Sequence, residues 1–221
     1  MLKNLKNDPL ILPIYMPTLL LAFSRGVLIP VLPLYVRDFG ASYGLIGLVL
    51  AAQELGTLVA DMPSGVLLRR LGRKRTMIIG LVTLILTTTL LFWARSVYEA
   101  ALLRFAAGFG MALFNIARHH YLAEMVKQST RGRAIAFYGG INRIGTFLGP
   151  AVGGMVAAAF NLRVPFLLFG AVGTISLLLV ALFVTRTGVA ISGETQHPSL
   201  LHTIKTHYQL LAAAGVAQMF A

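Results

Sequence analysis

The chain has 221 residues, of which 57% are hydrophobic and 12% are charged, and its formal net charge is +12. Soluble domains carry about 25% charged residues, so this composition excludes a soluble globular protein. The basic residues fall in short segments between apolar runs, without interleaved aromatic residues, which argues against a nucleic-acid-binding protein. The sequence has no cysteine, which excludes disulfides and thiolate metal sites.

Six apolar runs reach the length of about 20 residues that a helix needs to cross a bilayer. They lack the period-2 alternation of barrel strands, and only helices and closed barrels satisfy the backbone polar groups in lipid. We therefore predict an all-α integral membrane protein. The predicted spans are Ile11–Val36, Gly44–Leu68, Thr76–Ala94, Tyr98–Ala117, Ala134–Phe160 and Val164–Val184.

The basic residues outside these spans are distributed unequally between the two sides. Twelve fall in one alternating set of segments and three in the other, and basic residues mark the cytoplasmic side. This asymmetry predicts a multi-pass protein of the cell membrane (plasma or inner membrane) with a cytoplasmic N-terminus. The twelve are Lys3, Lys6, Arg69, Arg70, Arg73, Lys74, Arg75, Lys127, Arg131, Arg133, Arg186 and Lys205, and the three are Arg37, Arg95 and Arg163.

The C-terminal segment predicts a change of domain. We assign residues 1–186 to a six-helix transmembrane bundle, 187–207 to a polar cytoplasmic linker, and 208–221 to the truncated start of a seventh helix and second bundle. The last segment is apolar but too short to span a bilayer. On this interpretation the chain is an N-terminal half that works with a C-terminal half or with a second copy. The alternative is a half without transport activity of its own.

A faint internal repeat accompanies the six spans. Gly56-Thr57 and Gly65 in the second span recur 89 residues later as Gly145-Thr146 and Gly154 in the fifth. Secondary transporters often contain inverted repeats. In a three-plus-three repeat the second and fifth helices are equivalent, so the pattern favours that arrangement.

Charged residues inside the first two spans are candidates for function. Arg25 lies mid-span, and it either pairs with Glu54 or lines a cavity as a cation that selects the charge of the substrate. Glu54 and Asp61 share one face of the second span, about 10 Å apart along its axis. A carboxyl group in a low-dielectric surrounding can exchange protons near neutral pH. The alternatives are a packing ion pair with Arg104 or Arg143 and, for Asp61, simple solvation at the membrane boundary.

The connector after the second span is short and basic. Gly72 permits the backbone to reverse direction, and Gly65, Arg70, Arg73 and Lys74 surround that turn. The arginines are expected to anchor at the inner headgroups. The simpler alternative is that the segment only sets membrane orientation.

The fourth span contains Arg104, and an arginine at the bilayer centre costs about 2.5–3.5 kcal/mol on insertion scales. It should therefore face the bundle interior or a water-filled cavity. At about 100° per residue, one stripe runs along most of this helix. The stripe consists of Arg104, Gly108, Met111, Asn115 and Arg118, with His119 at its edge.

The fifth span contains Gly145, Gly149 and Gly153, which are spaced by four and share a face. Such faces let helices pack at backbone contact. Pro150 removes a backbone hydrogen bond and favours a kink. The face is either an ordinary close-packed interface or part of a helix that bends between two states.

The sequence has no G-x-x-x-x-G-K-[ST] loop for ATP, no cluster with metal-ligand spacing and no G-x-S-x-G elbow. We expect neither an enzyme nor a cofactor. The energy for any work should come from an ion gradient.

Three of these segments, in this order, resemble the signature motifs of the major facilitator superfamily. The connector is similar to G-x-L-x-D-R-x-G-R-K except that Arg69 replaces the acid, and Arg104 and Gly108 match R-x-x-x-G. The segment from Gly145 to Gly154 matches G-x-x-x-G-P-x-x-G-G at every specified position, including Gly153. The resemblance implies two six-helix halves around a central cavity. It also implies a cytoplasmic ion-pair latch, in which Arg73 or Arg69 is expected to pair with Glu124.

The last motif is associated in that family with antiporters, chiefly twelve-helix drug/proton exporters. The resemblance thus implies proton-coupled multidrug efflux of small amphipathic molecules by alternating access, with the bilayer, protons and the substrate as partners. Arg104 would influence the protonation of an acid such as Glu54, and the fifth helix would flex at Gly149-Pro150. A carrier for an organic anion or metabolite is the alternative, because Arg25, Arg104, Arg118 and Arg143 outnumber the acids within the spans.

Overall fold

The computed structural model describes residues 10–126 and 128–184. These residues belong to one compact unit. The predicted linker at 187–207 and the predicted start of a second bundle at 208–221 lie outside the described residues. Both assignments stay predictions.

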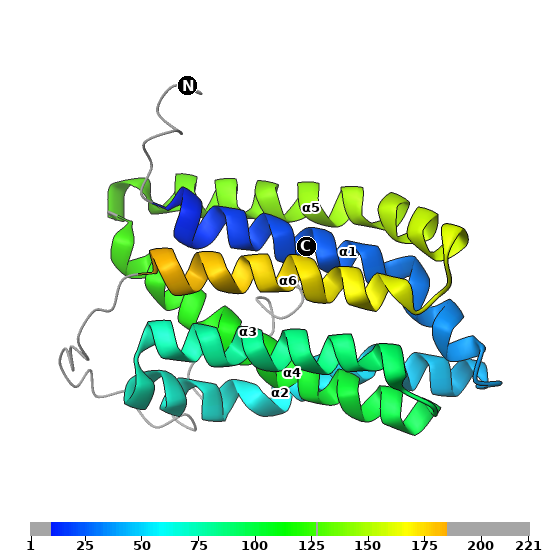
Figure 1. Ribbon diagram of the computed structural model, residues 1–221. Helices are drawn as coiled ribbons and strands as arrows, with labels where there is room; N and C mark the ends of the chain where they lie inside the picture. The colour runs from blue at the N-terminus through cyan, green and yellow to red at the C-terminus, as the bar shows by residue number, and fades with distance from the viewer. Residues whose placement is uncertain (1–9, 127, 185–221) are drawn as a thin grey trace, which may run out of the picture. The chain divides into compact units, whose positions relative to one another are not determined.

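Six long helices run alternately up and down in one bundle, which confirms the predicted six-helix all-α fold (Figure 1). Residues 10–126 and 128–184 contain no strand. Three short turns flank the helices: η2 (Ile11–Tyr15) precedes α1, η3 (Leu91–Trp93) follows α3, and η4 (Gln128–Thr130) precedes α5. The helices are α1 (Met16–Arg37), α2 (Tyr43–Leu71), α3 (Arg73–Leu90), α4 (Val97–Met125), α5 (Arg131–Ala159) and α6 (Val164–Phe183).

Local chemistry explains several helix ends. The Ser96 hydroxyl accepts a hydrogen bond from the Glu99 amide at 3.2 Å, and the Glu99 carboxylate accepts one from the Arg95 amide at 2.8 Å. This reciprocal cap satisfies amides that lack a partner at the start of α4. Gly72 adopts φ +75° between α2 and α3, a backbone region that favours glycine, so the predicted role of Gly72 in the reversal is confirmed.

The predicted end of the fourth span was too early. α4 continues to Met125 rather than ending at Ala117, and the Val126 amide still donates to the Leu122 carbonyl. An apolar run marks the depth of the hydrocarbon core, whereas backbone hydrogen bonds continue the helix through polar residues beyond it.

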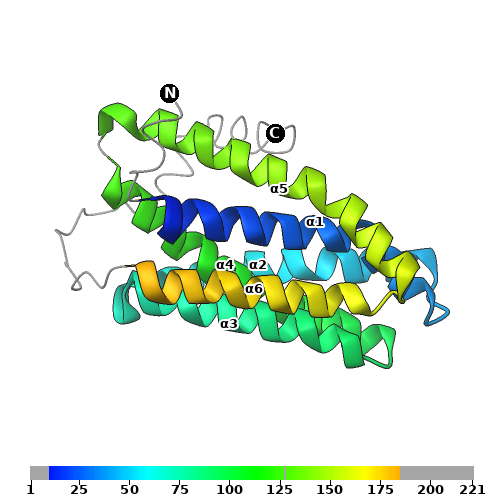
Figure 2. The ribbon, with the colours of Figure 1, turned by 45° about the horizontal axis from the view of Figure 1, so that its top comes forward.

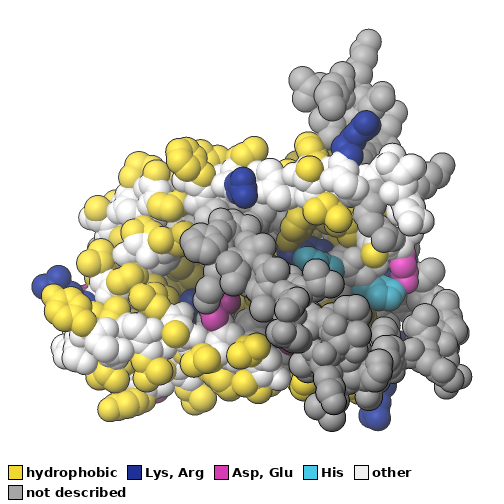
Figure 3. Space-filling view, turned by 180° about the vertical axis from the view of Figure 1, so that it is seen from behind, with side chains coloured by type: hydrophobic (Ala, Val, Ile, Leu, Met, Phe, Trp, Pro, Cys, Tyr) yellow, Lys and Arg dark blue, Asp and Glu magenta, His cyan; other side chains and the backbone are white. Residues whose placement is uncertain are grey.

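Five helices are long and apolar enough to cross a membrane: the segment Ile11–Arg37 with α1, then α2, α3 with η3, α4 and α6. The prediction of a sixth span of the same apolar kind does not hold for α5, although α5 is 29 residues long. Its middle contains Asn142 and Arg143. Elsewhere on the described surface hydrophobic side chains are widespread and charged ones few, as the view from behind shows (Figure 3).

The helices pair across the bundle rather than in chain order. α1 packs against α5, α2 and α3 pack against α4, and α6 packs against α1 and α3. α1 and α5 lie side by side in both ribbon views (Figures 1 and 2). In a three-plus-three repeat α1 corresponds to α4 and α2 to α5, so the α2–α4 and α1–α5 contacts are equivalent. This cross-pairing supports the predicted inverted repeat.

Glycines bring the paired helices to backbone contact. A Cβ added at Gly149 would lie 2.5 Å from the Gly26 Cα, and one added at Gly145 would lie 2.7 Å from the Leu19 carbonyl oxygen. The predicted glycine face of α5 is therefore a contact with α1, as small-residue faces between membrane helices usually are. Gly154, the last glycine of the motif, is exposed, and a Cβ added there would meet no atom of a neighbouring element within 4 Å.

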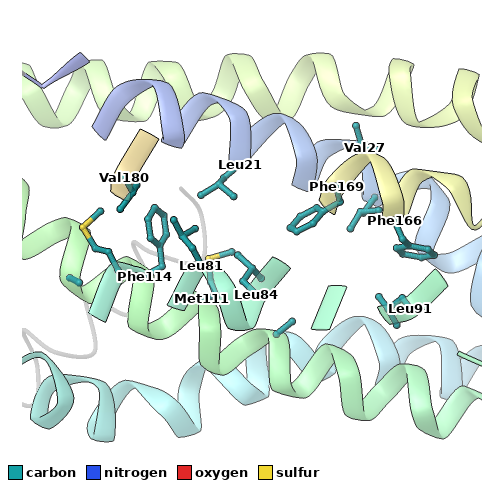
Figure 4. Packing of buried hydrophobic residues seen from close by; sticks show 14 of the residues in the cluster. Leu21, Val27, Leu81, Leu84, Leu91, Met111, Phe114, Phe166, Phe169 and Val180 are labelled. Carbon is teal, nitrogen blue, oxygen red and sulfur yellow. The ribbon is translucent and has the colours of Figure 1, made fainter. Parts of the chain in front are cut away.

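The core fills the space between α3, α4, α6 and α1 (Figure 4). Phe114, Leu81 and Leu84 are almost fully buried, and Phe166 and Phe169 of α6 lie beneath α1. The connections α2–α3 and α4–α5 lie together at one end of this bundle, which we call the basic end. The connections α1–α2, α3–α4 and α5–α6 lie at the opposite end.

Candidate functional site

A cavity of about 350 Å³ opens between α1, α2 and α4, with contributions from α3 and α6. Four polar side chains line it: Arg25 from α1, Gln53 and Glu54 from α2, and Arg104 from α4. The rest of its lining is apolar. A second cavity of about 370 Å³ lies among the connections at the opposite end, lined by residues such as Asp38 and Arg163.

Arg104 is held by an amide rather than by a carboxylate. Its Nη1 donates a hydrogen bond to Gln53 Oε1, across the close contact of α4 with α2. A Cβ added at Gly108, one turn further along α4, would lie 2.6 Å from the Thr57 amide nitrogen. Arg104 and Gly108 therefore have different roles in their motif: the arginine reaches the cavity, and the glycine allows the helices to approach.

Arg25 is held in the same way on the other side of the cavity. Its Nη2 donates a 2.8 Å hydrogen bond to Asn142 Oδ1 on α5. Neither amide was predicted from the sequence, because an opposite charge is the expected partner of an arginine in lipid. A signal was present: Asn142 follows Gln53 by 89 residues, the spacing that also relates Gly56-Thr57 to Gly145-Thr146.

Glu54 is exposed and lines the cavity. Within residues 10–126 and 128–184 it forms no ion pair with Arg25, Arg104 or Arg143, so the predicted packing ion pairs are wrong. Of the predicted charged candidates, Arg25, Glu54 and Arg104 are brought together here.

Asp61 and Asn115 lie away from this cavity. Asp61 is exposed on α2, nearer the basic end, and does not line the cavity. Asn115 accepts a 2.8 Å hydrogen bond from Arg118 Nη2 on its own helix. Arg118 is buried, with its guanidinium 4.9 Å from the Phe114 ring and 4.7 Å from the Tyr138 ring. The polar stripe of α4 therefore divides between the cavity and the bundle interior.

The motif after α2 forms a latch at the basic end. Arg73 is buried, pairs with Glu124 at the end of α4 and lies 4.6 Å from the centre of the Tyr121 ring. The expected pairing of Arg73 with Glu124 is confirmed. Within the described residues neither Arg69 nor Arg70 forms an ion pair, and both are exposed.

The remaining motif residues do not line the cavity. Gly65 lies against the α4 side chain Ile116, because a Cβ added there would be 4.0 Å from its Cδ1. Lys74 is half-buried in the first turn of α3. α5 continues as one helix through Pro150.

Comparisons with known proteins agree with this geometry. The family model described as Major Facilitator Superfamily matches residues 15–221. The chain is 26% identical over 189 residues to "Multidrug resistance protein MdtG" of Enterobacter lignolyticus, covering 84% of this chain and 45% of the relative. It is 25% identical over 209 residues to "Multidrug resistance protein 2" of Bacillus subtilis, covering 94% and 51%. "Quinolone resistance protein NorA" of Staphylococcus aureus is 25% identical over 166 residues, covering 75% and 42%.

Among solved structures, the crystal structure of the peptide transporter POT in complex with sulfate has a TM-score of 0.70 at 16% identity. The match covers 96% of this chain and 45% of that one. At this identity the likeness concerns the fold alone. The chain spans about half the length of the curated relatives it matches.

Proposed function

The chain belongs to the Major Facilitator Superfamily, a family of multi-pass membrane transporters, and we propose that it is one half of a proton-coupled exporter of small amphipathic molecules. The relatives that it matches are named for multidrug or quinolone resistance, which supports export of drug-like compounds. A second six-helix half, or a second copy of the chain, completes the transport path. Alternating access then exposes the cavity to each side in turn.

The orientation follows from the charges at the two ends of the bundle. The basic end is cytoplasmic in this proposal, and the N-terminus lies on the same side. The latch between Arg73 and Glu124 then closes the cytoplasmic end of the bundle. The cavity lies closer to the outer half of the membrane, because its α1 residues run from Arg25 towards Pro33 near the end of that helix.

The observation that carries the proposal is a carboxylate that shares one cavity with two guanidinium groups and forms no ion pair with any described residue. Glu54 lines the cavity together with Arg25 and Arg104. Neutral amides hold the arginines in place, so Glu54 stays free to take up and release a proton. When protonated, Glu54 no longer offsets the charge of Arg104. Proton binding therefore changes the net charge that a substrate meets.

The close packing of α5 on α1 affects how the bundle moves. Gly149 meets Gly26 at backbone contact, so the two helices move together as a pair. Pro150 follows directly, at a point where the backbone hydrogen-bond ladder is weakened. We place the bend that accompanies rocking of the two halves at this position.

The test is a proton-transport assay in liposomes. The chain and, in parallel, a version extended through a second six-helix half are reconstituted with a pH-sensitive dye inside, and a panel of amphipathic compounds is added outside. We expect a substrate-dependent pH change that Arg104→Ala abolishes while insertion and yield stay normal. Transport at the native rate by that variant would contradict the role of Arg104. A substrate-dependent flux without any pH change would contradict proton coupling.

A further inference from the structure

The same arrangement, an arginine hydrogen-bonded to an amide side chain, occurs on two sides of the cavity. On one side Arg25 of α1 donates to Asn142 of α5, and on the other Arg104 of α4 donates to Gln53 of α2. Asn142 follows Gln53 by 89 residues, as Gly145-Thr146 follows Gly56-Thr57. Each arginine therefore comes from the first helix of one repeat and each amide from the second helix of the other.

The same correspondence extends to the threonines. Thr57 Oγ1 lies 3.0 Å from the Gln53 carbonyl oxygen, and Thr146 Oγ1 lies 2.9 Å from the Asn142 carbonyl oxygen. Both threonines follow their amide residue by one helical turn. The internal repeat thus places two guanidinium groups on the cavity, each held by an equivalent neighbour.

The charges of the cavity do not cancel. Its lining contains two arginines and one glutamate, a formal charge of +1. Gln53 and Asn142 orient the guanidinium groups but are neutral. No ion pair within residues 10–126 and 128–184 includes Arg25 or Arg104. A positive charge in a poorly solvated site is costly unless an anion compensates it.

The arginines also retain hydrogen-bonding capacity. A guanidinium has five N–H donors, and one donor of each arginine is used by its amide. The Nε of Arg25 and the Nε of Arg104 are buried without an acceptor in the described part of the chain, so the donors open to a ligand in the cavity are the terminal N–H groups that the amides leave unused. Arginine binds carboxylates with two parallel hydrogen bonds, so an entering carboxylate matches both the charge and the donors.

The apolar residues of the lining indicate what the rest of the ligand should be made of. Leu28, Leu32, Leu50 and Phe169 present hydrocarbon to the same cavity. Pockets of this kind bind an apolar body and fix its orientation through a few polar groups. A lipophilic cation would meet two like charges and one glutamate, so the lining disfavours it.

We propose that Arg25 and Arg104 together form a subsite for the carboxylate of an amphipathic substrate, whose apolar body lies against the leucines and Phe169. This inference deepens the proposed function, on which it rests, by naming the charge class of the substrate.

The experiment measures binding of three probes of similar shape to the purified full chain in zwitterionic lipid nanodiscs. The probes are 1-naphthaleneacetate, the uncharged 1-naphthaleneacetamide, and the cation 1-naphthaleneethylamine, titrated by calorimetry against empty nanodiscs as background. We expect the acetate to bind at least tenfold more tightly than the amide, and the cation more weakly than both. Equal affinity for acid and amide, no binding of the acid, or tighter binding of the cation each overturns the proposal.

Variants separate a binding role from a packing role. Arg25→Gln should weaken binding of the acetate at least tenfold and leave binding of the amide unchanged, whereas Arg25→Lys should be intermediate. Arg37→Gln is the matched control, because it removes the same charge from an exposed position at the end of α1. If Arg25→Gln lowers binding of the acetate and the amide equally, Arg25 only supports the helix packing and the subsite is wrong.

The same titration distinguishes this proposal from the transport function. Acid-selective binding that depends on Arg25, without proton-linked flux in liposomes, supports the subsite and contradicts the exporter. Proton-linked flux of compounds that do not compete with the acetate supports the exporter and contradicts the subsite.

Discussion

The contact of α1 with α5 and the contact of α2 with α4 hold equivalent places in the internal repeat, yet they differ in charge. Position 54 on α2 is a glutamate, and position 143, 89 residues later on α5, is an arginine. Both side chains are exposed. Next to them lie the two equivalent amides, Gln53 and Asn142. The scaffold is thus repeated, whereas the acid that the proposed function uses belongs to one copy.

This difference separates the features that the helix contacts require from the charge that the proposed function uses. The small residues and the amide-held arginines recur on both sides, because two helices must approach closely and a cation must be held in each place. The glutamate does not recur. Four predictions test the comparison, beginning with the shared packing and ending with a single hydroxyl group.

The largest effect should come from filling the backbone contacts. Gly149→Leu on the α1–α5 side and Gly56→Leu on the α2–α4 side both place a side chain against backbone, since the added Cβ at either glycine already meets the neighbouring helix. Overpacking costs about 1–3 kcal/mol and more where backbone must move. We expect little monodisperse protein from either variant in size-exclusion chromatography. Gly154→Leu is the control, because that glycine has open space, and its yield should be normal.

The second prediction concerns the two repeat-related positions that differ in charge, 54 and 143. Glu54→Gln should reduce proton-linked transport at least tenfold, about 1.4 kcal/mol, because the cavity loses the one carboxylate that the described residues supply to it. Arg143→Gln, the change at the equivalent position of α5, should leave proton release per substrate intact. Dye quenching in liposomes measures both. Equal losses in the two variants would show that proton exchange does not belong to the α2–α4 side.

The comparison also shows how far sequence reasoning reached. Apolar run length predicted the six helices, and glycines spaced by four predicted a close helix contact. The positive-φ turn at Gly72 and the pairing of Arg73 with Glu124 followed from the motif between α2 and α3. These features depend on local periodicity or on a pattern of fixed spacing.

The hydrogen-bond partners of Arg25 and Arg104 could not be predicted from the sequence, because charge alone points to the nearest acid and takes no account of neutral acceptors. Gln53 and Glu54 are adjacent in sequence, yet the side chain of Gln53 faces α4 and that of Glu54 is exposed. A helix turns by about 100° per residue, so adjacent residues face different surroundings. For Asn115 the shared stripe with Arg104 suggested a place in the same site. Asn115 instead accepts a hydrogen bond from Arg118, further along the helix.

The third prediction concerns the two amides that hold the arginines. Asn142→Ala leaves Arg25 without its acceptor, whereas Gln53→Ala leaves Arg104 in the electrostatic field of Glu54, whose carboxylate is expected to accept in place of the lost amide. Removing the acceptor of a buried donor costs about 1–3 kcal/mol. We expect a cost of about 1 kcal/mol for Asn142→Ala and less for Gln53→Ala in unfolding by a denaturing detergent. A larger loss in Gln53→Ala would mean that Glu54 does not compensate Arg104.

The smallest expected effect concerns the two threonines. Thr57 Oγ1 lies 3.2 Å from the Gly108 carbonyl oxygen on α4, in addition to the carbonyl of its own helix. The hydrogen bond found for Thr146 is to its own helix, at the Asn142 carbonyl. Hydrogen bonds between membrane helices contribute about 0.6 kcal/mol on average. Thr57→Val should therefore destabilise the bundle by about that amount, and Thr146→Val should have no measurable effect, since the Asn142 carbonyl keeps its helical partner.

Valine nearly matches threonine in shape, so the pair of variants isolates the hydroxyl group at two equivalent positions. Unfolding in mixed micelles of increasing denaturing detergent gives both free energies under one condition. Equal destabilisation would mean that the hydroxyls act through their own helices alone. A selective loss in Thr57→Val would mean that the α2–α4 contact, which also holds Arg104 beside Glu54, is fixed by one polar contact more than its repeat-related counterpart. The α2–α4 side would then be the more rigid of the two.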